Sequence, residues 1–251
     1  MTVLISVLGG CSGAASGEGR GPSAESSASD AASPAQETAP RFTPDPGRVP
    51  RTTVQGESLV DHVVLRPADW GPGFVAQPVA ESAPRTVAVL DDRCRWRRES
   101  LPPGVLASLS RYAELPGRDG KGTVRVTAVA TVHTSGLDAD EQLSVTLEEV
   151  LRCRKQEIRA GEHLEGLTST GTPFGARGQQ WADDSVYERG VYVTAEGTHT
   201  YTWSVARVGS VTFGVSVKGA RGYSDAELQR WITESLPVMA DRVKRRTGRE
   251  G

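Results

Sequence analysis

The sequence lacks any apolar stretch of the roughly 18–20 residues that a transmembrane helix needs. It also has no asparagine, and only four of its 29 basic residues are lysines. The net charge is -2, so the chain has no broad basic field of the kind that attracts nucleic acid. We therefore expect neither a membrane-spanning nor a nucleic-acid-binding protein.

Common catalytic and cofactor patterns are missing as well. The sequence contains no Gly-x-Ser-x-Gly, Ser-x-x-Lys, His-Glu-x-x-His, dinucleotide or Walker pattern. Its four histidines have no second ligand at a metal-binding spacing, and the pairs Asp91-Asp92 and Asp183-Asp184 point apart if their segments are extended. We expect no catalytic residue, no metal and no cofactor, and hence a protein that is not an enzyme. A site assembled from distant residues remains the alternative.

The chain begins with an apolar run, residues 3–8, followed by Gly9, Gly10 and Cys11. This pattern resembles a bacterial lipobox. The resemblance implies that the Cys11 thiol carries diacylglycerol and becomes the N-terminus after cleavage, with palmitate as a further modification. Residues 1–10 are then a truncated lipoprotein signal segment whose start codon lies upstream. The alternative is a chance Gly-Gly-Cys. The bias toward Arg and against Asn is typical of GC-rich genomes, so we expect an actinobacterial envelope lipoprotein.

Two cysteines, Cys94 and Cys153, remain after Cys11. An exported chain meets an oxidising compartment, so an even pair predicts a disulfide bond. Two buried free thiols are the alternative.

The chain divides into a tether and a folded domain. Residues 11–56 comprise the lipidated cysteine and a linker rich in Ser, Ala, Gly, Pro and Glu. Such a segment buries too little surface to offset its ordering entropy, so we expect it to be disordered. Residues 57–251 are expected to form one binding domain.

Periodicity predicts the elements of this domain. A helical turn is expected over 67–70, and helices are expected from the pairs Asp138/Glu141 and Ser224/Glu227, which read as capping boxes. The first helix is predicted to carry Cys153 and to reach Ile158. Alternating apolar residues predict strands at 123–133, 186–194, 198–207 and 211–218, and residues 74–79 and 106–115 are candidate strands. Residues 87–90 and 93–96 form one further apolar piece, which carries Cys94. Residues 165–184 are predicted to be a polar connection. The expected fold class is α+β, a mostly antiparallel sheet with helices packed on it.

The strands at 198–207 and 211–218 carry small hydroxyl residues between large ones. We predict that the large residues Tyr201, Trp203 and Phe213 share the core face. The small residues would then form one continuous opposite face, as candidate ligand-facing residues: Thr200, Thr202, Ser204, Thr212 and Ser216. This face is predicted either to line a pocket or to be a solvated outer surface.

The ordered region resembles the extracellular sensor domain of PknH-like serine/threonine kinases. The likeness lies in the Pro-Ala-Asp-Trp turn at 67–70, a cysteine on a strand beside Trp96, a capped helix with Cys153, and the segment 206–211 before the last helix. Those sensor domains carry two disulfides, whereas this chain has cysteines for one. A Mog1/PsbP-like sandwich is a related possibility. Either resemblance implies a domain that binds a ligand or partner.

Two functions are therefore expected. The first is a lipid-anchored, sensor-like lipoprotein on the extracytoplasmic face of the cell membrane, which binds a small or lipidic envelope ligand. The second is a structural or interaction protein that docks on a membrane protein or another envelope partner.

Overall fold

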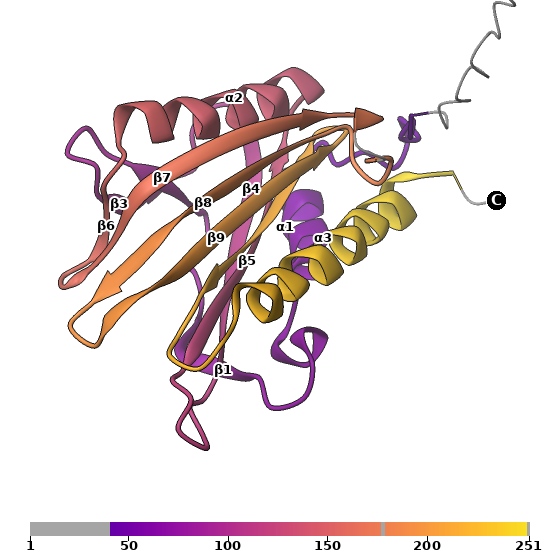
Figure 1. Cartoon of the computed structure of the whole chain (residues 1–251). Helices are drawn as coiled ribbons and strands as arrows, with labels where there is room; N and C mark the ends of the chain where they lie inside the picture. Colours follow the sequence, from indigo (N-terminus) through magenta and orange to yellow (C-terminus); the bar gives the residue numbers. More distant parts are fainter. Residues whose placement is uncertain (1–40, 177–178, 250–251) are drawn as a thin grey trace, which may run out of the picture. The chain divides into compact units, whose positions relative to one another are not determined.

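An antiparallel sheet of eight strands organises the domain (Figure 1). The structure, a computed structural model, describes residues 41–176 and 179–249. The predicted signal segment, Cys11 and most of the predicted linker lie outside these residues. Within them the α+β class is confirmed, because the chain forms one large antiparallel sheet, one small one and three α-helices.

The strand order in the large sheet is β1-β4-β5-β10-β9-β8-β7-β6. The bounds in that order are Val75–Glu81, Val105–Leu115, Val124–His133, Val211–Lys218, Gly197–Val208, Asp184–Thr194, Glu162–Pro173 and Gln156–Arg159. A separate hairpin consists of β2 (Thr86–Leu90) and β3 (Trp96–Ser100). Strands predicted from clear alternation fall within one or two residues of their predicted positions. In contrast, β3 begins only where the predicted segment 93–96 ends.

Helices cover both faces of this sheet (Figure 1). The helices α1 (Thr53–Val63) and α3 (Asp225–Thr247) pack on one face, which we call the α3 face. Its core includes Val126, Phe213 and Met239, all fully or almost fully buried. The helix α2 (Gly136–Arg152) packs on the other face, which we call the α2 face, against a smaller core that includes Leu164, Val186 and Tyr201. The 3-10 turn Pro67–Trp70 occurs where it was predicted.

The N-terminal part of the domain corrects the predicted boundary. Gln55 donates its backbone N–H to Thr52 Oγ1 at 3.3 Å and accepts from the Thr52 backbone N–H at 3.2 Å, which caps α1. Upstream, Phe42 packs against the core and Asp45 N donates to the carbonyl of Thr247 at 2.8 Å. The domain therefore begins no later than Phe42, not at residue 57.

The segment from α2 to β7 differs most from the prediction. Ser135, not Asp138, caps α2, and its hydroxyl accepts from the Asp138 N–H at 3.1 Å. The helix ends at Arg152, and Ile158 lies in β6. The predicted polar connection, 165–184, contains most of β7, whose Thr, Ser and Gly residues show no apolar alternation. In contrast, α3 begins at the predicted Ser224/Glu227 capping box.

Candidate functional site

The strand register divides the five predicted ligand-facing residues between the two faces of the sheet. The turn Gly209–Ser210 pairs Val208 with Val211, so Phe213 lies opposite Ala206 and Ser216 lies opposite Trp203. Directly paired residues share a face. Thr200, Thr202 and Ser204 are therefore on the α3 face, and Thr212 and Ser216 are on the α2 face. The prediction of one continuous hydroxyl face is wrong.

The prediction is wrong because it assigned the two faces of each strand from the large residues alone. Tyr201 and Trp203 of β9 pack under α2, whereas Phe213 of β10 packs under α1 and α3. Because both faces are covered, large residues on neighbouring strands need not share a face. Thr202, Ser204, Thr212 and Ser216 are all buried. Their role in ligand binding stays a prediction.

Thr200 differs from the other four because it lines an open groove of about 490 Å3. The β8–β9 hairpin extends beyond the start of α3 (Figure 1), which leaves part of the α3 face without a helix. The groove lies there, between the hairpin and the loop that leads into α3. It is lined by Arg189, Gly190, Val191, Thr198, His199, Thr200, Ala220, Arg221, Gly222, Tyr223 and Leu228. We call this the Thr200 groove.

The charged residues that line the Thr200 groove in the described structure are basic, Arg189 and Arg221. Asp225, the first residue of α3, lies beside the groove. Its carboxylate accepts from Thr200 Oγ1 at 2.6 Å and lies 3.3 Å from Arg189 Nη2. Both side chains of this ion pair are more than half exposed, so the pair contributes little stability. Asp225 thus holds both Arg189 and the Thr200 hydroxyl at one side of the groove.

A second groove, of about 520 Å3, is more apolar. Its walls include Pro44, Pro46, Pro50 and Leu106, together with Ser135 and Gly136 at the start of α2. This groove was not predicted, because residues 44–50 belonged to the predicted linker.

Two carboxyl groups without a predicted role lie between α2 and the sheet. Glu188 of β8 is 6% exposed. Burial, together with the nearby charge of Glu149 on α2, raises its pKa to about 8. Burial also raises the pKa of Glu149 to about 7, and Arg152 offsets part of that rise. Burial raises the pKa of Tyr201 well above its usual value, and the two carboxyl groups raise it further. The alternation of residues along β8 places the charged Glu188 at an inward-facing position, and this is the signal by which the sequence could have identified it.

The two adjacent aspartate pairs serve structural roles. Asp183 and Asp184 both form ion pairs with Arg207, whose side chain is 14% exposed. Asp91 accepts hydrogen bonds from the backbone N–H groups of Arg93 and Arg95, both at 2.9 Å. Neither pair forms the facing arrangement of an acid/base dyad. No cluster of three or more potential metal ligands occurs in the described residues.

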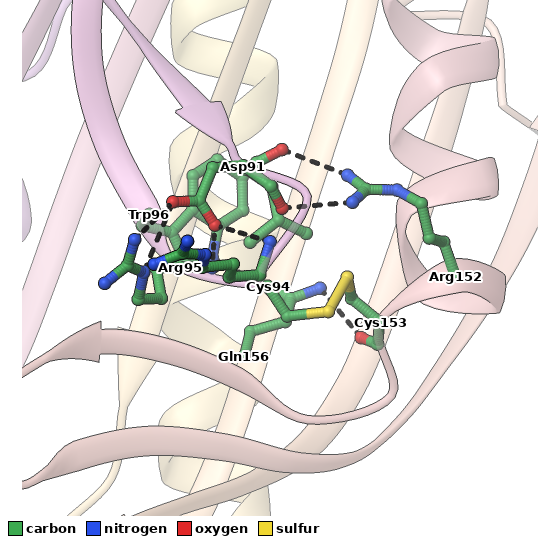
Figure 2. The surroundings of a disulfide bond; sticks show 9 residues. Asp91, Cys94, Arg95, Trp96, Arg152, Cys153 and Gln156 are labelled. Carbon is green, nitrogen blue, oxygen red and sulfur yellow. Dashed lines mark hydrogen bonds and ion pairs between the residues drawn. A yellow bond between two sulfur atoms is a disulfide. The ribbon is translucent and has the colours of Figure 1, made fainter.

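The predicted disulfide between Cys94 and Cys153 is present, with a Cα–Cα separation of 5.6 Å (Figure 2). Cys94 lies in the turn between β2 and β3, not on a strand, and Cys153 caps the end of α2. Figure 2 also shows Arg152, which donates to the carbonyl oxygens of Leu90 and Asp91, each at 3.0 Å. The disulfide therefore joins the β2–β3 hairpin to the end of α2.

The chain matches no known family model and no curated protein sequence. Its fold is similar to the extracellular domain of PknH from Mycobacterium tuberculosis, with a TM-score of 0.48 and 10% identity over 81% of this chain and 99% of that one. It is also similar to an uncharacterised protein from Mycobacterium smegmatis, with a TM-score of 0.34 and 15% identity over 68% of this chain and 90% of that one. None of the helices in the described residues is long and apolar enough to cross a bilayer. Both likenesses concern the arrangement of elements, at identities too low to transfer a residue's role.

Proposed function

We propose that this chain is a lipid-anchored extracytoplasmic domain that binds a small anionic molecule in the Thr200 groove. The observation that carries the proposal is the combination of two arginines with the Thr198 hydroxyl in one open groove, beside Thr200, whose hydroxyl donates to Asp225. The groove volume of about 490 Å3 lies within the range of about 300–1,000 Å3 that is typical of small-molecule sites.

The expected ligand follows from the groove's chemistry. Guanidinium groups bind carboxylates and phosphates through paired N–H donors, so Arg189 and Arg221 favour one of these groups. Val191, Tyr223 and Leu228 supply an apolar wall for the rest of the molecule. The role we propose is binding without a chemical step.

The proposed location outside the cytoplasm rests on other observations. The Cys94–Cys153 disulfide suits an oxidising compartment. The resemblance of residues 3–11 to a lipobox supports lipidation of Cys11, which lies outside the described residues.

Titration calorimetry with phenyl phosphate and with benzoate tests the groove and separates phosphate from carboxylate recognition. We expect one probe to bind, and Arg221→Gln to weaken that binding about tenfold, because a hydrogen bond to a charged group contributes about 1.5–3 kcal/mol. Arg93→Gln is the matched control, because Arg93 is exposed in the β2–β3 turn, away from the groove. Equal binding by the Arg221 and Arg93 variants, or no binding of either probe, would refute the proposed site.

A further inference from the structure

The outer edge of β7 is open over much of its length. The neighbouring strand β6 has only four residues and pairs with β7 only as far as Leu164. Beyond that point, Leu167 N–H donates to the carbonyl of Arg154 at 3.5 Å. No described strand pairs with this edge over residues 168–173 (Figure 1).

The register shows which backbone groups point out of this edge. The two-residue turn between β8 and β9 makes Thr194 and Gly197 a hydrogen-bonded pair, so the even-numbered residues of β8 bond to β9. Its odd-numbered residues then bond to β7, through Thr168, Thr170 and Thr172. The N–H and C=O groups of Ser169 and Gly171 therefore point outward, in agreement with the outward N–H of Leu167.

This edge lacks the features that usually prevent strands from pairing. Residues 166–175 carry no charged side chain. Exposed edges are ordinarily protected by charges, bulges or prolines, and here Pro173 and the irregularity between Glu165 and Thr168 lie at the two ends of the open part. The intervening residues can pair in an extended conformation.

The same edge is complementary to itself. In an antiparallel pair centred on Thr170, Ser169 of one copy lies opposite Gly171 of the other, so all four outward N–H and C=O groups of each copy find partners. The facing threonines are then Thr168 with Thr172, and Thr170 with its own copy, and cross-strand Thr pairs are favourable. The paired residues 168–172 carry no charge, so no like charges meet across the two strands. We propose that the chain forms a twofold-symmetric dimer through β7, in which the two eight-stranded sheets join.

An exposed leucine on α2 supports this partner. The side chain of Leu147 lies near Gly171 of β7, where a Cβ atom would be 3.7 Å from its Cδ1. Leu151, one turn further on, follows the same side of the helix and is 76% exposed. A second sheet joined at β7 would bring the second copy's α2 toward this side chain and reduce its exposure.

Cysteine cross-linking tests the predicted register. In the full chain with Cys11→Ser, so that no native free thiol competes, Thr170→Cys should form an intermolecular disulfide under mild oxidation. Its two copies would face each other in a non-hydrogen-bonded pair about 4.5 Å apart, a Cα separation that allows a disulfide. Thr168→Cys is the matched control, because that residue faces Thr172 of the other copy. Equal cross-linking of the two variants would overturn the register.

Sedimentation of the same Cys11→Ser chain over a concentration series tests the dimer itself. We expect the mass to double with concentration, and we expect Thr170→Glu to keep the protein monomeric by placing like charges on the twofold axis. An equal mixture of Thr170→Glu and Thr170→Lys should restore the dimer. Circular dichroism confirms that each variant is folded. A chain that stays monomeric at every concentration, or a dimer that Thr170→Glu leaves intact, would overturn the proposal.

Discussion

Glu188 lies at an inward position of β8, between Ser169 and Trp203 on the neighbouring strands. A carboxylate there loses its hydration, and the Glu149 carboxylate on α2 adds repulsion, so the pKa of Glu188 rises to about 8. An acid whose pKa is higher in the folded state binds protons more tightly there than in the unfolded chain. Its contribution to stability is therefore largest below its ordinary pKa near 4.5 and is lost as the pH rises through about 8.

Glu188→Gln should remove most of this pH dependence. The contribution of Glu188 to the free energy of unfolding, measured with urea as the difference between the native chain and the Gln variant, should fall by about 3 kcal/mol between about pH 5 and about pH 8.5, because each unit of pKa shift corresponds to about 1.4 kcal/mol. The Gln variant should keep the smaller pH dependence that Glu149 contributes, since burial raises the pKa of that carboxyl group to about 7. Glu148→Gln is the control, since Glu148 is an exposed neighbour on α2. A Gln variant with the native pH dependence would contradict this account.

At the scale of elements, sequence reasoning succeeded where one pattern was unambiguous. The alternation of β5 and β10 and the capping box of α3 placed these elements correctly. It failed for β7, whose small polar residues do not alternate with apolar ones, and at the C-terminal end of α2. Strand faces could not be assigned from side-chain size, because helices cover both sides of the sheet.

The β2–β3 hairpin is a small sheet of its own, which the disulfide and Arg152 link to α2 and which hydrogen bonds link to β6. Removing the disulfide by the double substitution Cys94→Ala, Cys153→Ala should lower the free energy of unfolding by about 4 kcal/mol, the loop-entropy value for a sequence separation of 59 residues. Cys11→Ala is the control in the same urea titration. A loss of less than about 1 kcal/mol would show that the hydrogen bonds to Arg152, Gln156 and Glu157 hold the hairpin without the disulfide.

At the scale of the whole molecule, fold class and disulfide pairing were predictable from the sequence, but the groove was only partly so. Thr200 was among the predicted ligand-facing residues, whereas Arg189 and Arg221 come from separate segments and have no signal of their own. Their meeting depends on where α3 begins relative to the β8–β9 hairpin, which is a property of the assembled fold. The boundary at residue 57 was wrong because the tertiary contacts of Phe42 and Asp45 leave no trace in composition.

The proposed function requires that the whole domain be held outside the cell membrane through Cys11. The measurement that tests this most directly is fractionation of cells expressing the protein with a complete lipoprotein leader, together with metabolic labelling by a radioactive fatty acid. We predict that the native protein is labelled, is found with the membranes and is cut by protease added to intact spheroplasts. Cys11→Ser should be unlabelled and released into the medium. A Cys11→Ser protein that stays with the membranes, or a native protein that external protease cannot reach, would contradict the account.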